Sequence, residues 1–509
     1  MFRITSNNPV KRVFINTSFL YIKMIITTLI SLYTTRLILK ILGVDDFGLY
    51  NLLAGVIALL SFLNAAMMQA TQRFLSVHLG KKDIENVRTI FNNSIVLHLF
   101  FACIIVFLLE VSTSFLFSGG LNIPFDKIDV AKHIYQLMIL MVVITIMGSP
   151  YNAVINARED LWFFAIIEIV ITFLKLISTW GLFFFHKDQL VLYTYFILGI
   201  TLLGVFFKII WSYKQYPEVR FSVFYVKKTV MKEMLFFCGW NTLGAMAQVG
   251  RTQGTAIVLN TFGGIVLNAA YGISNQVNSL LIYFSQMMTT SIAPQIMKAK
   301  GEGDISKMIY LSVLTSKLSF YLSSLFAVPI MIELPFILRL WLRDIPEYTI
   351  SFCYYTIIFL LLQLYPGLVR LLQADGHIKY WQIFNTTFLL LPIPLGSYLF
   401  YQGHSIYILF NVMIIFQCLT FVSTLFFCKK YINLDVSEYL LSVVLKPVLI
   451  LWASYFICSQ FKFIYNEYMR FILIGIFSSC ILTGLFYYVV LNRIEKEKVR
   501  QILNRRKCL

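Results

Sequence analysis

The chain has 509 residues, of which 59% are hydrophobic and only 13% are charged. A soluble domain of this length does not need so much apolar surface, whereas a protein that crosses a membrane many times does. The formal net charge is +18. Lys and Arg are scattered over short loops and form no single basic face, which argues against a nucleic-acid partner. Composition therefore predicts an all-α polytopic membrane protein.

Apolar stretches along the chain are long enough to give about fourteen transmembrane helices. They are expected at residues 13–41, 48–72, 91–117, 133–155, 161–185, 190–212, 234–259, 265–292, 308–338, 349–372, 382–400, 406–428, 443–460 and 471–491. The first stretch is too long for a secretory signal and lacks a small-residue cleavage pattern, so we expect it to be retained.

The loops between these spans differ in their Lys and Arg content. When the N-terminus is placed in the cytoplasm and the loops are assigned alternately to the two sides, most Lys and Arg fall on the cytoplasmic side. The basic linker 213–233 and the tail after Leu491 are the richest of these segments. The positive-inside rule then predicts that both termini are cytoplasmic, and topology accounts for most of the net charge.

A weak internal repeat relates the two halves of the chain. It aligns Gly43 with Gly264, Tyr50 with Tyr271, and the GKKDI loop at 80–84 with the GEGDI loop at 301–305. Parallel repeats six spans apart are typical of two pseudo-symmetric transporter lobes. We therefore expect an N-lobe with helices 1–6 (1–213), a cytoplasmic linker (214–233), a C-lobe with helices 7–12 (234–428), and helices 13–14 with a basic cytoplasmic tail (429–509).

Cationic and amide side chains concentrate in the first two spans of each predicted lobe. Arg251 lies mid-span and shares a helix face with Asn241 and Gln248. A charge facing lipid is costly, so such residues normally face a bundle interior or a wet cavity. The other cations predicted to line a cationic cavity are Lys23, Arg36, Arg73 and Lys317, and the other polar lining residues are Asn64, Asn275 and Asn278.

The sign of these charges indicates an anionic cargo such as phosphate or diphosphate, because guanidinium and ammonium groups bind phosphate oxygens strongly at low dielectric. For any single amide, the alternative is that it joins neighbouring helices by hydrogen bonds. Three intramembrane carboxylates are candidates for coupling to protons or sodium: Glu110, Glu168 and Glu333. Lys208 is expected to reach the membrane surface from its span end.

Signals for enzymes, cofactors and metals are weak. The sequence has no HExxH, Walker A or GxSxG motif, and its six histidines are dispersed. Its eight cysteines include no CxxC pair. We therefore expect a transporter with no catalytic residue, no metal and no cofactor.

The run from Thr34 to Ser94 resembles the N-terminal signature of Wzx-type polysaccharide flippases of the multidrug/oligosaccharidyl-lipid/polysaccharide (MOP) superfamily. An LG-x-x-x-FG-x-Y element lies at 42–50, and a QRFLS-x-x-LG-x-x-D element lies at 72–83. The resemblance implies a V-shaped, MATE-like pair of six-helix lobes with two extra helices. It also implies that undecaprenyl-diphosphate-linked oligosaccharide is moved across the bacterial inner membrane by alternating access, for capsule, O-antigen or exopolysaccharide assembly.

The resemblance has further implications for site and partners. Related lipid II flippases use arginines in spans 1, 2 and 8, whereas span 8 has none here and Arg251 lies on span 7. This departure argues against lipid II as cargo. Implied partners are the lipid-linked glycan, membrane lipids, and a polysaccharide polymerase with its chain-length machinery.

Two other functions stay open. A drug/cation antiporter of the same superfamily should favour acidic cavity residues, which is the reverse of the sign seen here. A membrane glycosyltransferase or polymerase usually exposes large external loops, which this chain lacks.

Overall fold

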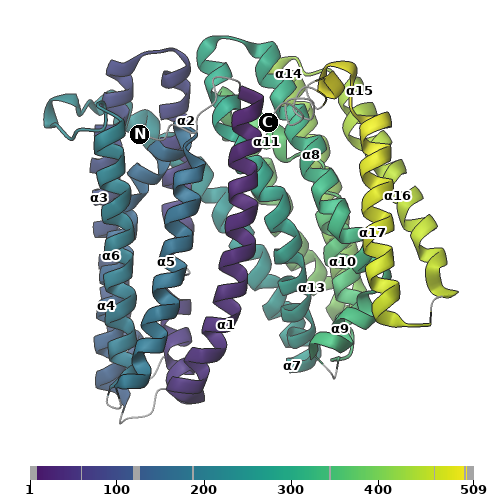
Figure 1. The fold of residues 1–509 in the computed structure, drawn as a ribbon, viewed down its shortest axis with the longest axis horizontal. Helices are drawn as coiled ribbons and strands as arrows, with labels where there is room; N and C mark the ends of the chain where they lie inside the picture. The colour runs from purple at the N-terminus through teal and green to yellow at the C-terminus, as the bar shows by residue number, and fades with distance from the viewer. Residues whose placement is uncertain are drawn as a thin grey trace. The chain divides into compact units, whose positions relative to one another are not determined.

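The computed structural model describes residues 9–58, 60–117, 127–185, 188–342, 345–463, 465–497 and 500. Every regular element in these ranges is helical (Figure 1). Ten of the described helices are long and apolar enough to cross a membrane, and two bent pairs raise the number to as many as twelve. The predicted fold class, an all-α polytopic membrane protein, is confirmed. Residues 501–509 of the predicted basic tail lie outside the described residues.

The helix α7 (Lys228–Glu302) is not among these apolar spans, although it corresponds to two of the predicted ones. It is broken at Gly264, and each of its arms is long enough to cross a bilayer. Asn241, Gln248 and Arg251 lie on its first arm, and Asn275 and Asn278 lie on its second.

Two compact units divide the chain, residues 1–242 and 243–509, with the boundary inside α7. The predicted lobe limits at 213 and 234 stay a prediction. Unit 1 contains α1 (Pro9–Ala58), α2 (Ser61–Gly80), α3 (Ile84–Phe115), α4 (Ile128–Ala157), α5 (Leu161–Gly181), η3 (Leu182–Phe184), α6 (Gln189–Gln215), η4 (Val223–Tyr225) and the start of α7. Within it α1 packs on α5, and α4 packs on α2, α3 and α6. Its core contains Ile105, Ile134 and Tyr135.

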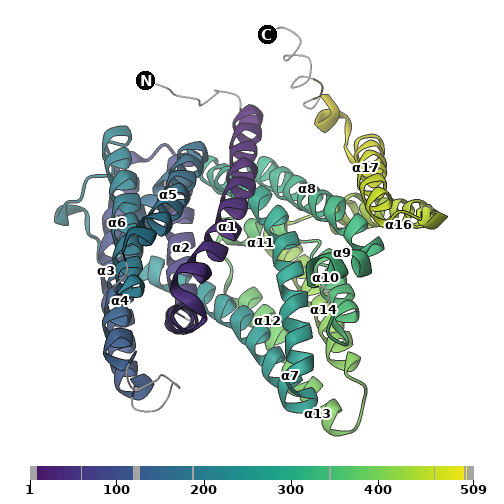
Figure 2. The same ribbon diagram turned by 60° about the horizontal axis from the view of Figure 1, so that its bottom comes forward.

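Unit 2 contains the rest of α7, followed by α8 (Ile305–Ile332), α9 (Leu334–Leu342), α10 (Thr349–Leu361), α11 (Pro366–Asp375), α12 (Lys379–Leu390), α13 (Pro392–Tyr401), α14 (Tyr407–Ile432), α15 (Val436–Tyr439), η5 (Leu440–Leu445), α16 (Lys446–Ser459), η6 (Gln460–Phe463), α17 (Glu467–Leu485) and η7 (Phe486–Val490). The helices α11, α16 and α17 all pack on α8 (Figure 2). Gly367 allows α11 to approach α8 closely, since a Cβ there would lie 1.9 Å from the Ser312 carbonyl oxygen.

Several of the predicted spans are broken in the structure, and predicted span 48–72 is one of them, because it runs across α1 and α2, a pair bent by 49°. Predicted span 308–338 is two helices, because α8 ends at Ile332 and α9 begins at Leu334, next to Pro335. Predicted span 349–372 is a pair bent by 45° between α10 and α11. Pro366 explains the break between α10 and α11. It lacks a backbone N–H, and it occupies the first turn of α11, where the N–H has no partner within the helix.

Local geometry recurs at the positions that the sequence repeat aligns. Gly43 (φ 76°) and Gly264 (φ 68°) break α1 and α7 with left-handed φ values that favour glycine. Asp83 and Asp304 then cap α3 and α8, each accepting a hydrogen bond from a backbone N–H three residues on. Hydrogen bonds from Asn86 lower the pKa of Asp83. The two units therefore share the conformation of their first break and first connection.

Candidate functional site

Arg251 lies on the first arm of α7 with its guanidinium against an aromatic ring. The Cζ atom is 4.6 Å from the centroid of Phe359 on α10. Its Nε is shielded and has no hydrogen-bond partner in the described residues. Within the same part of the chain, no Asp or Glu forms an ion pair with Arg251. An aromatic ring offsets less of a desolvated charge than a full negative charge does, so this guanidinium is only partly compensated.

A small cavity of about 20 Å³ adjoins Arg251 inside unit 2. It has room for an ordered water but not for a large anion. Its lining comes from both arms of α7, from α10 and from α14: Arg251, Tyr271, Asn275, Asn278, Tyr355, Thr356, Phe359, Phe410, Met413 and Ile414. Asn278 is buried, and its Oδ1 lacks a hydrogen-bond partner within the described ranges. The predicted residues Arg251, Asn275 and Asn278 are thus brought together, and no carboxylate of the described chain lines this cavity.

The intramembrane charges of unit 1 are arranged differently. The buried Lys208 on α6 pairs with Glu168 on α5 at 2.8 Å. The ammonium groups of Lys23 and Lys208 lie 4.7 and 5.0 Å from the ring centroid of Phe164. The expectation that Lys208 extends to the membrane surface is therefore wrong, because it is held inside by Glu168. Two cations and one carboxylate make this cluster, which we call the Phe164 cluster, net positive.

Two further predicted site residues are held in ion pairs within unit 2. Lys317 contacts both oxygens of Glu495 at 3.2 and 3.3 Å, and both side chains are buried. Glu333 receives two hydrogen bonds from Arg470, at 2.6 and 2.8 Å. Because their charges are neutralised in place, we remove Lys317 from the residues proposed to bind cargo, and Glu333 from those proposed for ion coupling.

The other predicted charged residues lie outside these groups. Arg36 is exposed on α1. Arg73 on α2 contacts two rings, Phe74 at 4.9 Å and Phe237 at 4.6 Å. Glu110 is exposed and accepts a hydrogen bond from Gln136 at 3.1 Å. None of them joins the Phe164 cluster in the described contacts.

The predicted amide residues are also dispersed. Asn241 is buried in unit 1, with an Nδ2 that has no partner in the described residues, while Gln248 is exposed in unit 2. Asn64 accepts a hydrogen bond from Ser149 at 2.8 Å and so joins α2 to α4. A cavity shared by the two units, as predicted from the repeat, stays a prediction.

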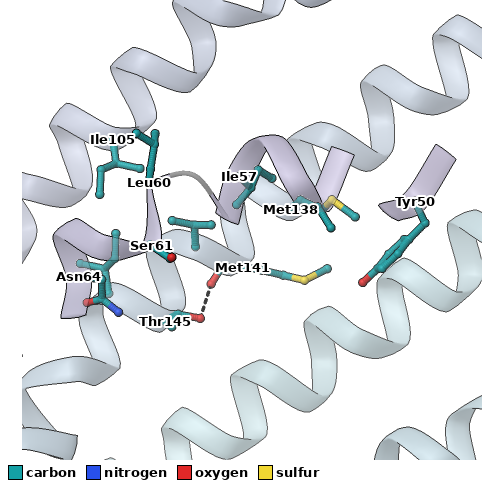
Figure 3. Close-up of a pocket in the computed structure, with 12 residues that line it drawn as sticks. Tyr50, Ile57, Leu60, Ser61, Asn64, Ile105, Met138, Met141 and Thr145 are labelled. Carbon is teal, nitrogen blue, oxygen red and sulfur yellow. Dashed lines mark hydrogen bonds between the residues drawn. The ribbon is translucent and has the colours of Figure 1, made fainter. Parts of the chain in front are cut away.

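Asn64 also lines another cavity, a space of about 270 Å³ within unit 1. Figure 3 shows Ser61 and Asn64 on one side of this space and Tyr50 on the other. Between them lie mainly Ile, Leu, Val and Met side chains, including Met138 and Met141. With so little polar lining and no charge among its described residues, this cavity suits apolar groups, in contrast to the space beside Arg251.

Sequence reasoning missed the aromatic partners of the cations. Phe164 lies against both Lys23 and Lys208, and Phe359 lies against Arg251. A detectable signal was the i, i+4 spacing of Tyr355 and Phe359, which places these two aromatic rings on one face of α10. Within the described ranges, no group of three or more His, Cys, Asp and Glu side chains could hold a metal ion.

Known proteins resemble this chain in two ways. The MatE family profile matches residues 20–181. A search of curated proteins gave no match.

Solved structures match over most of the chain. A crystal structure of MATE in the straight conformation has 17% sequence identity and a TM-score of 0.73, covering 84% of this chain and 97% of its own. An outward-facing multidrug resistance MATE family transporter of the MOP superfamily has 16% identity and a TM-score of 0.73, covering 84% and 96%. A MOP superfamily transporter from Pyrococcus furiosus Vc1, described as having a binding pocket of reverse polarity, has 16% identity and a TM-score of 0.72, with the same coverage. The chain is thus a multi-pass membrane protein with a MATE-like fold, and two of these similar structures are described as transporters.

Proposed function

We propose that this membrane protein is a flippase that moves an oligosaccharide linked to undecaprenyl diphosphate across the bacterial inner membrane. The translocated glycan would be used in capsule, O-antigen or exopolysaccharide assembly by a polymerase and its chain-length machinery. The observation that carries the proposal is Arg251, an intramembrane guanidinium with no ion-pair partner in the described residues, beside amides and aromatic rings. Both termini would lie in the cytoplasm.

The sign and setting of the charges support an anionic cargo. A guanidinium without a carboxylate partner in a low-dielectric site binds a phosphate oxygen strongly, and its planar fork can hold two. The Phe164 cluster is also net positive. The similar MOP transporter described with reversed pocket polarity supports the view that this fold accommodates pockets of either sign.

The neighbours of Arg251 suit the rest of such a cargo. Asn278 Oδ1 is an unused acceptor for a hydroxyl group in the described structure, and Asn275 adds an amide. Tyr271, Tyr355 and Phe410 supply flat apolar surface against which sugar rings pack. Because the present cavity has room only for water, access for a diphosphate requires helix movement, as alternating access does. No covalent step is required.

A second candidate, a drug/cation antiporter, is favoured by one observation. Glu168 is a partly exposed intramembrane carboxylate in unit 1, and the solved structures of this fold include a multidrug transporter. Against it, Glu168 is already paired with Lys208 and near Lys23. A cationic drug would have to displace these cations. Coupling to a proton or sodium gradient, through Glu168 or Glu110, stays a prediction.

Reconstituted proteoliposomes test the proposal directly. A fluorescent undecaprenyl-diphosphate oligosaccharide is supplied in one leaflet, and its arrival in the other is followed by enzymatic or chemical accessibility. Wild-type protein should accelerate this transfer, Arg251→Gln should abolish it, and Arg251→Lys should retain part of it.

Thr252→Ala is the matched control, because Thr252 neighbours Arg251 and bonds only to its own helix in the described contacts. It should transport normally. Uptake of a cationic dye with no transfer of the lipid-linked glycan would replace the flippase by the antiporter.

A further inference from the structure

The connection between α6 and α7 exposes apolar side chains. Phe224 is 95% exposed, Val223 is 71% exposed and Phe221 is 46% exposed. These residues belong to residues 216–227, which we call the α6–α7 loop. Neighbouring apolar groups on a connection are unusual on a water-facing surface and commonly mark a contact with a membrane or another protein.

The outer half of this loop is held by α3. The buried Asn92 accepts a hydrogen bond from the Ser222 backbone N–H at 2.6 Å. Asn93 donates to the Tyr225 carbonyl at 3.3 Å, and Arg88 donates to the Tyr225 hydroxyl at 2.9 Å. A 3-10 turn, η4, spans the exposed residues. The apolar side chains are therefore presented outward by a fixed backbone.

The inner half is held by the turn between α4 and α5. Glu218, which is buried, pairs with Arg158, and Tyr216 donates a hydrogen bond to Asp160. Val219, which follows Glu218 and precedes Arg220 in the chain, is also fully buried. The loop thus has a packed inner side and an apolar outer side, like an element that lies on an interface.

Positive charge surrounds the exposed apolar residues. Four cations lie on or beside the loop and all of them are exposed: Lys214, Arg220, Lys227 and Lys228. The carboxylate within the loop, Glu218, is buried and engaged by Arg158, so it does not neutralise this surface. Apolar groups ringed by Lys and Arg match the interfacial layer of an anionic membrane, where acyl chains lie just beneath negative headgroups.

The position of the α6–α7 loop also fits contact with a membrane. It follows α6 directly, and it packs on the first turns of α3, so it lies at the end of membrane-crossing helices. Figures 1 and 2 both show it standing out sideways from α3 and α6. If α3 and α6 cross a bilayer, a loop that projects sideways from their ends would meet the membrane surface.

We propose that the α6–α7 loop is a membrane-surface anchor that inserts Phe224 and Val223 into the headgroup layer of an anionic leaflet, with Arg220, Lys227 and Lys228 on the lipid phosphates. The anchor fixes the connection ahead of α7, the helix that carries Arg251. This inference is independent of which cargo the protein carries.

Spin labelling of the full chain in nanodiscs tests it. A nitroxide is attached at Phe224→Cys after the exposed cysteines Cys103, Cys418 and Cys480, together with Cys508, are replaced by serine. In discs with phosphatidylglycerol, the label should be reached by oxygen several-fold more readily than by a water-soluble nickel chelate. A matched label at Glu85→Cys, an exposed position in the first turn of α3, should show the opposite preference.

Lipid charge and loop fixation supply two further readouts. In discs of phosphatidylcholine alone, the preference for oxygen at position 224 should fall, whereas that at position 85 should not change. Arg88→Gln should increase the mobility of the nitroxide at 224 by releasing Tyr225. A label at position 224 that is reached more readily by the nickel chelate than by oxygen in both lipids overturns the proposal. The proposal is also overturned if the label is shielded from the nickel chelate only when a second protein is added.

Discussion

Both units contain cations within membrane-crossing helices, but the partners of these cations differ between the units. In unit 1, Lys208 is buried against Glu168, and Lys23 shares the ring of Phe164 with it. In unit 2, Arg251 has an aromatic ring and a small polar cavity but no carboxylate in the described structure. A buried charge with a partner serves structure, whereas one without a partner costs stability and so indicates a role in binding.

Unit 2 also contains an internal control for this distinction. Lys317, on α8, is a cation within a span like Arg251, yet it is neutralised by Glu495 near the C-terminus. The comparison between Arg251 and Lys317 separates a charge available to a ligand from one used for packing. Replacing Lys317 by an uncharged residue should therefore lower stability, whereas replacing Arg251 should leave stability nearly unchanged and abolish transport.

The largest expected loss of stability follows from Lys317→Met. This change leaves Glu495 buried without its cation, which costs about 3–5 kcal/mol in the free energy of unfolding. Titration with SDS in mixed micelles measures it. The double variant Lys317→Met, Glu495→Gln should recover most of the loss, and a double variant as unstable as the single one would show that the pair is not the cause.

A smaller loss is expected from Glu168→Gln in unit 1. Lys208 is then buried without its counter-charge, at a cost of about 3 kcal/mol, the lower end of the range because Glu168 is partly exposed. Adding Lys208→Met should restore stability. If Glu168→Gln unfolds at the same SDS concentration as wild type, the Phe164 cluster is not held by this ion pair.

Lys23→Met tests the weaker contact in the same cluster. Its ammonium lies over Phe164 and forms no ion pair in the described contacts, so removal should cost about 1 kcal/mol. Lys40→Met, on an exposed part of the same helix, is the control and should leave the unfolding midpoint unchanged. A loss as large as that of Glu168→Gln would mean that Lys23 is a main counter-charge.

Arg251→Met should change stability least. Loss of the contact with Phe359 is offset by removal of a poorly compensated charge, so the free energy of unfolding should change by less than about 1 kcal/mol or rise. Transport should nevertheless be lost, as in proteins that give up stability for function. Strong destabilisation would instead assign Arg251 a structural role.

Sequence patterns predicted the features that depend on short stretches of chain. Gly43 and Gly264 were aligned by the repeat, and both break a helix; Asp83 and Asp304 were aligned, and both cap one. Such features depend on single residues. Glycine permits positive φ, and aspartate at the start of a helix accepts hydrogen bonds from its first backbone N–H groups.

The partners of the charges could not be predicted in this way. Glu168 and Lys208 are 40 residues apart, and Lys317 and Glu495 are 178 apart. Whether each cation meets a carboxylate depends on which helices are neighbours and how each is rotated, which periodicity within one helix does not specify. The Arg251 site was predicted more fully because four of its lining residues lie on α7 itself, and three of these, Arg251, Asn275 and Asn278, were predicted.

The most direct test of the central claim is whether Arg251 recognises a diphosphate. Thermal unfolding of the purified protein is measured with undecaprenyl diphosphate and with uncharged undecaprenol, for wild type and for Arg251→Gln. We predict that the unfolding midpoint of wild type is much higher with undecaprenyl diphosphate than with undecaprenol. Arg251→Gln should remove most of this difference. An equal difference in both proteins would contradict the account.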